Sequence, residues 1–152
     1  MNLTKFQRTS LLGVTLFLLV FSFSGCAPIT SLRLDDPYMA KTDKIQYELM
    51  PSGNVVRSYT YTDSIKNITY TVGVSANDEI IYIGTRDPNF KMGGLTVGSP
   101  VGNYLNKGDL RYASGWAYFV PVKDGWYAGL DYKNQPTSDS PVLYFFQYRF
   151  GK

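Results

Sequence analysis

Apolar residues recur at every second position along much of the chain, which is the pattern of strands with one buried face. The clearest stretch is 67–74, where Ile68, Tyr70, Val72 and Val74 alternate with polar residues or glycine. Further strand candidates, one of them a short apolar run, lie at 54–62, 79–84, 115–122, 126–132 and 141–150. The pattern therefore predicts about six strands.

Short turn signals connect these strand candidates. Residues 75–78 (Ser-Ala-Asn-Asp) separate the strand candidates 67–74 and 79–84. Residues 123–125 (Lys-Asp-Gly) separate the candidates 115–122 and 126–132. Asp, Asn and Gly tolerate the backbone conformations that tight turns require. We therefore expect two hairpins and an antiparallel sheet.

One short helix is expected after the third strand. Ser99 is a suitable N-cap, Pro100 suits the first helical position, and Lys107-Gly108 suits the end. The apolar face of this helix would consist of Val101, Tyr104 and Leu105. A helix of two turns is not stable alone. The expected fold class is therefore α+β, an antiparallel sheet of about six strands with one short helix packed on it.

The first 25 residues have the layout of a secretory signal peptide. Lys5 and Arg8 lie in a segment without acidic residues, a mostly apolar run follows at 11–23, and the small residues Ser24 and Gly25 precede Cys26. A charged region, an apolar region and a small-residue cleavage site define such signals. We expect cleavage immediately before Cys26.

The sequence Phe23-Ser24-Gly25-Cys26 resembles a bacterial lipobox, although the motif prefers Leu where this chain has Phe23. The resemblance implies that Cys26 receives a diacylglyceryl group and anchors the chain in a lipid bilayer. Ala27, where Asp would resemble an inner-membrane retention signal, implies the periplasmic face of the outer membrane in a Gram-negative host, and otherwise the cell membrane. The alternatives are an ordinary signal peptide and an uncleaved anchor, but the apolar run is shorter than the roughly 20 residues that span a bilayer.

Composition divides the rest of the chain into a tether at 26–44 and a single β-rich globular domain at 45–152. The tether is polar, with proline and aspartate and little periodicity. Thirteen Tyr and nine Phe, with many Thr, Val and Ile, favour strands in the domain. A polar tether lets a folded domain stand away from a membrane.

Charge and missing residue types exclude several functions. The formal net charge is +3, but after removal of Lys5 and Arg8 with the signal, 13 basic and 12 acidic residues remain. This balance gives no electrostatic footprint for nucleic acid. The chain has no His and one Cys. General-base chemistry by His, zinc sites built from His or several Cys, and internal disulfides are therefore excluded.

Residues 79–132 carry a strand followed by Asp87-Pro88-Asn89-Phe90, then Gly94-Leu95-Thr96-Val97-Gly98-Ser99, and later a Gly125-Trp126 step. This order resembles a pattern in small exported bacterial domains. It is similar to the small outer-membrane assembly lipoprotein of the β-barrel assembly machinery and to β-lactamase-inhibitor-like domains. The resemblance implies a glycine-flanked segment that leads into a helix packed on a sheet, and it transfers no partner or binding residue.

No catalytic residue, metal ligand or cofactor site is predicted. The acidic residues fall mostly in or beside predicted turns, where Asp is common for backbone reasons. The segment Gly93-Gly94-x-x-x-Gly98 follows a loop and lacks the Lys of a phosphate-binding loop. Asn77, Asp78 and Glu79 lack the spacing of an EF-hand calcium site.

An aromatic cluster at 112–132 is the one feature with the character of an interface, because Trp and Tyr combine large apolar area with a polar tip. Period two places Trp116 with Tyr118 and Val120, and Trp126 with Ala128, Leu130 and Tyr132; we expect both faces to be core. Tyr127 points the other way and is expected to be exposed. Tyr127 and Tyr112 are the candidate binding residues.

The sequence thus favours a non-enzymatic, membrane-anchored binding or structural module in the periplasm, acting on envelope proteins or peptidoglycan. The alternative is a lipoprotein inhibitor or immunity-type protein that blocks an envelope hydrolase. An envelope hydrolase that uses carboxylates is the third possibility.

Overall fold

A computed structural model describes residues 32–38 and 44–151 of the chain. The predicted signal peptide, Cys26 and the first part of the tether lie outside these residues. The elements are β1 (Gln46–Leu49), β2 (Val55–Asp63), β3 (Ile68–Val74), β4 (Ile80–Thr85), β5 (Lys91–Met92), β6 (Leu95–Thr96), η1 (Gly102–Lys107), β7 (Arg111–Ala113), β8 (Ala117–Pro121), β9 (Tyr127–Leu130) and β10 (Tyr144–Tyr148).

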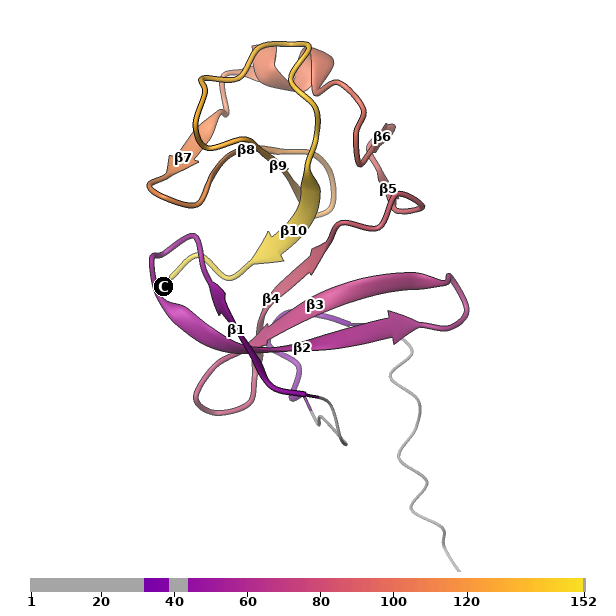
Figure 1. Ribbon diagram of the computed structural model, residues 1–152, viewed down its shortest axis with the longest axis vertical. Coiled ribbons are helices and arrows are strands. Elements are labelled where there is room, and N and C mark those ends of the chain that lie inside the picture. Colours follow the sequence, from indigo (N-terminus) through magenta and orange to yellow (C-terminus); the bar gives the residue numbers. More distant parts are fainter. Residues whose placement is uncertain (1–31, 39–43, 152) are drawn as a thin grey trace, which may run out of the picture.

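An antiparallel sheet of eight strands forms the body of the domain, in the order β1-β2-β3-β4-β10-β9-β8-β7 (Figure 1). The six predicted strands are present as β2, β3, β4, β8, β9 and β10. The predicted number was too low, because β1 and β7 extend the sheet at its two edges. The last strand along the chain, β10, lies in the middle and joins β4 to β9.

The sheet is strongly curled, and its two ends bend toward each other (Figure 1). Met50 and Val56, from one end, belong to the same apolar cluster as Ala113, from the other end. Gly84 and Gly129 lie on this concave face, each beneath an aromatic ring. Glycine permits tight bends in strands, and a ring laid over it replaces the missing side chain. The concave face is therefore packed by aromatic rings that the curvature brings together.

The convex face carries the larger core. Val72, Ile83, Val120 and Phe145 are almost completely buried there. Segments outside the large sheet cover this face, and their buried side chains are Tyr38, Phe90, Leu95, Val101 and Val142. A sheet buried on both faces explains why Phe145 and Phe146, which are neighbours in β10, are both inaccessible to solvent.

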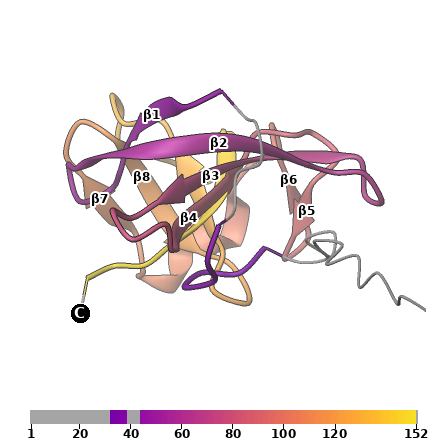
Figure 2. The ribbon, with the colours of Figure 1, turned by 90° about the horizontal axis from the view of Figure 1, so that it is seen from below.

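Residues 32–38, which we call the strap, pack on the convex face (Figure 2). The amide of Asp35 donates to the carbonyl of Ile80 over 2.8 Å, and the amide of Ile80 donates to the carbonyl of Asp36 over 2.9 Å. The ring of Tyr38 lies 5.1 Å from that of Tyr59 and is buried. This part of the sequence assigned to the tether therefore contributes to the fold.

The expected α-helix at 99–108 is absent, and among the described residues no helix packs on the sheet; the segment forms the short 3-10 helix η1 instead. The hydroxyl of Ser99 does not cap a helix, because it bonds to the backbone of Thr96. Gly102 has φ of 56°, which interrupts an α-helix that starts at Pro100. The expected end is confirmed, since Gly108 adopts the left-handed conformation.

Both predicted hairpin turns are confirmed. The hydroxyl oxygen of Ser75 accepts hydrogen bonds from the amides of Asn77 and Glu79, each over 3.2 Å. In the second turn Asp124 and Gly125 both have positive φ, and the amide of Trp126 donates to the carbonyl of Lys123. Adjacent residues with positive φ suit the twist of a two-residue hairpin.

Candidate functional site

A cavity of about 350 Å³, which we call the concave pocket, opens at one end of the concave face. Edge strand β1 forms one wall, and β4, β10 and the segments beside β8 and β9 form the others. Its lining residues are Glu48, Leu49, Tyr82, Arg86, Trp116, Leu130, Asp131, Tyr132, Leu143 and Tyr144. The volume is within the range of roughly 300–1,000 Å³ that is typical of small-molecule sites.

Two tyrosines that line this pocket lie close against glycines of the sheet. A Cβ added to Gly84 would come within 2.2 Å of the hydroxyl oxygen of Tyr82, and one added to Gly129 within 2.4 Å of the ring of Tyr144. Tyr144 is the cross-strand partner of Gly129, whereas Tyr82 precedes Gly84 by two residues on the same face. The glycines thus leave room for the rings, and the rings hold the hydroxyls in place.

The side chains of Tyr82 and Tyr144 are mostly buried, and their hydroxyls have no hydrogen-bond partner among the described residues. The hydroxyl oxygens themselves are not sealed from solvent, since among the described residues only Ser58 Oγ is a fully buried side-chain atom without a partner. Burial raises the pKa of Tyr82 well above its usual value of 10.0, the nearby Glu48 raises it further, and Arg86 opposes the change. Burial also raises the pKa of Tyr144, and Tyr82 adds to this effect. Both groups are therefore neutral hydroxyls at physiological pH, each able to donate and to accept a hydrogen bond.

Charged side chains of both signs surround these hydroxyls. The guanidinium carbon of Arg86 lies 5.0 Å from the centre of the Tyr144 ring, which is within the range of a cation–π contact. Glu48 projects from the edge strand, and the carboxylate of Asp131 accepts hydrogen bonds from the amide of Lys133 and the side chain of Asn134. The lining therefore carries two carboxylates and one guanidinium, with no excess positive charge to attract an anion.

A second cavity, of about 470 Å³, lies on the convex face beside the strap and is called the strap pocket. Leu32 and Leu34 of the strap form one side, and Tyr70, Phe90 and Trp126 form apolar walls. The ring centres of Phe90 and Trp126 are 4.7 Å apart. Burial, followed by the charge of Asp63, raises the pKa of Tyr70. The strap thus helps to enclose an aromatic hollow on the face opposite the concave pocket.

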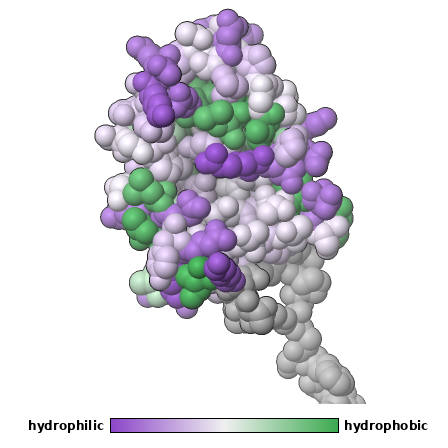
Figure 3. Space-filling view, viewed as in Figure 1, coloured by the Kyte–Doolittle hydropathy of each residue, from purple (hydrophilic) through white to green (hydrophobic). Residues whose placement is uncertain are grey.

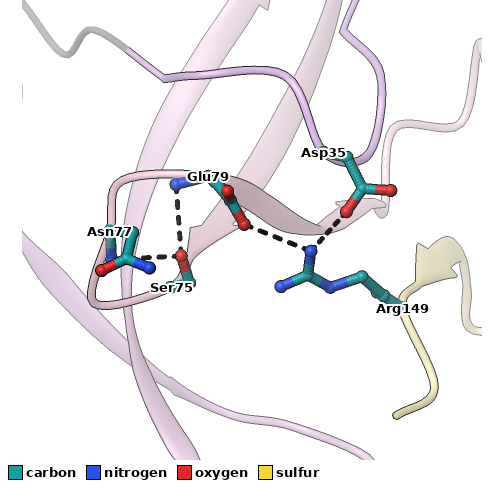
Figure 4. Close-up of polar contacts among 5 residues, drawn as sticks. All are labelled: Asp35, Ser75, Asn77, Glu79 and Arg149. Carbon is teal, nitrogen blue, oxygen red and sulfur yellow. Dashed lines mark hydrogen bonds and ion pairs between the residues drawn. The ribbon is translucent and has the colours of Figure 1, made fainter. Parts of the chain in front are cut away.

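Arg149 fastens the strap to the sheet through two carboxylates (Figure 4). Its Nη1 forms one ion pair with Asp35 of the strap and a second, over 3.2 Å, with Glu79, the residue directly before β4. These two hydrogen bonds raise the pKa of the Arg149 guanidinium. One guanidinium binds the carboxylates of both Asp35 and Glu79. The two carboxylates therefore make a structural contact and do not have the different environments that would separate the pKa values of a catalytic acid and base.

The structure does not bring the two candidate binding residues together. Tyr112 is 52% exposed, and its ring packs at a tilt against that of Tyr118, with ring centres 4.5 Å apart, on the convex side of β7 and β8. Tyr127 lies on the concave side, half-buried between Phe119 and Phe146. The exposure expected for Tyr127 is therefore only partial. A binding role for either residue stays a prediction.

The expected sheet face is correct for Trp126 and wrong for Trp116. Trp126 packs on the convex core that contains Ala128 and Leu130, as expected, and is half-buried. Trp116 does not share a face with Tyr118 and Val120, because it belongs to the turn before β8 and packs 4.8 Å from Phe146 on the concave side. Tyr132, expected with Trp126 in the core, is 45% exposed at the concave pocket.

Sequence reasoning missed most of the concave pocket. Tyr82 in β4 and Arg86, which follows β4, are far in sequence from Tyr144, and they lie near it only because β10 pairs with β4. One local signal was available: Gly84 and Gly129 interrupt buried strands, and glycine inside a strand marks a close approach of another group. Among the described residues, no group of three or more His, Cys, Asp or Glu could hold a metal ion.

Comparisons of the chain with protein-family models, with curated proteins and with solved structures gave no match. In the described part of the chain, no helix is long and apolar enough to cross a membrane. On the face shown in Figure 3, apolar residues form separate patches among polar and neutral ones. The proposed function therefore rests on the sequence and on the residues that line the two pockets.

Proposed function

We propose that this chain is a lipid-anchored envelope protein whose β domain is a non-enzymatic binding module. The observation that carries the proposal is the sequence Phe23-Ser24-Gly25-Cys26, placed directly after a charged and an apolar segment. The acyl chains on Cys26 would hold the domain at the membrane. The preformed aromatic hollows of the domain would supply the binding surface, since rigid aromatic pockets are typical of binding sites.

The position of the strap supports this arrangement. Leu32 already contacts the folded domain, and only residues 27–31 separate it from Cys26. Six backbone steps reach at most about 20 Å. An acylated Cys26 would therefore hold the convex face, on which the strap lies, close to the bilayer. The concave pocket would then open away from the membrane, toward the periplasm.

Fractionation and sedimentation test the proposal with the full chain. Wild-type protein should fractionate with the outer membrane in a Gram-negative host, whereas Cys26→Ser should remain an unprocessed precursor. Detergent-purified wild-type protein should sediment with peptidoglycan sacculi or recover a resident envelope protein from solubilised envelopes. Recovery of a lytic enzyme whose activity falls on binding would contradict the proposal and favour the inhibitor alternative. Failure to recover any envelope component would also contradict it.

A further inference from the structure

We propose that the concave pocket binds a sugar ring of an envelope polysaccharide. This assignment deepens the proposed function and rests on it for the source of the glycan. The proposal starts from the phenol hydroxyls of Tyr82 and Tyr144, which line the concave pocket and have no hydrogen-bond partner among the described residues. Their oxygens are not sealed from solvent, so water or a ligand in the pocket can form hydrogen bonds with them.

The lining favours a neutral ligand with many hydroxyls. Glu48 and Asp131 can accept hydrogen bonds, Arg86 can donate them, and the two phenols can do both. An anion would meet two carboxylates against one guanidinium. A purely apolar ligand would strip water from these polar groups and leave the two phenols unpaired, which costs free energy. A sugar hydroxyl can satisfy each of them.

The aromatic walls suit the other surface of a sugar. A pyranose ring presents a face of C–H groups, and this face packs against the flat side of an aromatic ring. Trp116 is held edge-on to Tyr144, at an interplanar angle of 82°, and Tyr132 is 45% exposed at the pocket. Trp116 thus stands as a wall beside the Tyr144 ring. Because Trp116 and Tyr144 already pack in the apolar cluster of the concave face, these two rings need little ordering when a ligand binds.

The location of the pocket agrees with this ligand. The strap and the concave pocket lie on opposite faces of the sheet. An anchor that holds the strap near the bilayer would turn the concave pocket toward the glycan strands of the cell wall. The pocket is open at the edge of the sheet, beside the exposed residues Glu48 and Leu49 of β1. A single ring within a longer polymer can therefore enter.

Binding can be measured by fluorescence with the full chain in detergent. In a Trp126→Phe protein, Trp116 is the only tryptophan, so a signal change reports on the concave pocket alone. The probes are tetramers of β-1,4-linked N-acetylglucosamine, glucose, mannose and galactose. We expect a saturable change with at least one of them, and N-acetylglucosamine is the first candidate because it occurs in cell-wall glycan strands.

Tyr82→Phe and Tyr144→Phe should each weaken binding about tenfold, which is the cost of one lost hydrogen bond of about 1.4 kcal/mol. Both variants should keep the melting temperature, since each removes only a hydroxyl without a protein partner. Tyr148→Phe is the matched control, because Tyr148 packs on the same apolar cluster of the concave face but does not line the pocket. It should bind normally.

Two results would overturn the proposal. One is no saturable change with any tetramer at millimolar concentration, and the other is binding that Tyr148→Phe abolishes while Tyr82→Phe and Tyr144→Phe leave it intact. The sugar titration does not depend on whether Cys26 is acylated. If no sugar binds, the lipid anchor and a protein-binding role remain possible. If Cys26 is found unmodified, a positive sugar titration remains valid.

Discussion

The ring of Tyr144 covers its cross-strand partner Gly129 so closely that a Cβ at Gly129 would lie 2.4 Å from the ring. Gly129→Ala should therefore force the ring away and disturb the aromatic cluster. We expect a loss of about 1–3 kcal/mol in the free energy of unfolding, which is typical of overpacked cores. Chemical denaturation measures this loss. Gly151→Ala is the control, because nothing lies near a Cβ at that position, and equal stability of both variants would refute the close contact.

The raised pKa values of Tyr82 and Tyr144 predict a loss of stability at alkaline pH. In the unfolded chain these phenols ionise near pH 10, whereas burial keeps them protonated in the folded state to higher pH. Above pH 10 the folded state therefore binds more protons than the unfolded state, and the free energy of unfolding falls as pH rises.

Denaturation curves at several pH values above 9 test this dependence. The wild-type chain should lose stability steadily above pH 10. The double variant Tyr82→Phe/Tyr144→Phe should lose less over the same interval, because neither position can ionise. Parallel curves for the two proteins would show that both phenols titrate normally in the folded state.

The strap should stabilise the domain. A chain that begins at Ile45 lacks Tyr38, which is buried against Tyr59, and exposes the strap pocket. Removing one buried aromatic side chain costs about 2 kcal/mol or more. Thermal melts should therefore show a lower midpoint for this chain than for one that begins at Leu32. Equal midpoints would mean that the strap does not pack on the sheet in solution.

Arg149→Met separates the ion pairs from the apolar contacts of the strap. The change should speed hydrogen exchange at the amides of Asp35 and Tyr38, because the strap loses its link to the C-terminal segment. High salt should have a similar but weaker effect on the wild-type chain. Unchanged exchange in Arg149→Met would assign the docking of the strap to Tyr38 and the backbone bonds alone.

The sequence pattern predicted the strands whose two faces differ in polarity. It did not predict the two edge strands, and it predicted a helix that tertiary contacts prevent. In β3, Val72 is buried while Thr69 is exposed, so the alternation is visible. All four residues of β1 are exposed, and β7 has only three residues, so neither produces a clear pattern. The helix prediction failed because Ser99 bonds to the preceding turn and Gly102 bends the backbone.

The candidate site was predictable only in outline. The aromatic segment at 112–132 does supply Trp116 and Tyr132 to the concave pocket. Its base comes from Tyr82 and Tyr144, which lie 62 residues apart in the sequence and meet because β10 inserts beside β4. Period two cannot reveal which strands are neighbours. It also cannot show that both faces of the sheet are buried, which is why Tyr127 was expected to be exposed.

Metabolic labelling with a palmitate analogue tests the lipid anchor, on which the proposed function depends, most directly. The wild-type chain should carry the label, and Ser24→Ala should carry it too, since a small residue still precedes Cys26. Cys26→Ser should carry none and should accumulate as the longer precursor, because acylation precedes cleavage. Label on the Cys26→Ser protein, or its absence from the wild-type chain, would contradict the lipid-anchored account.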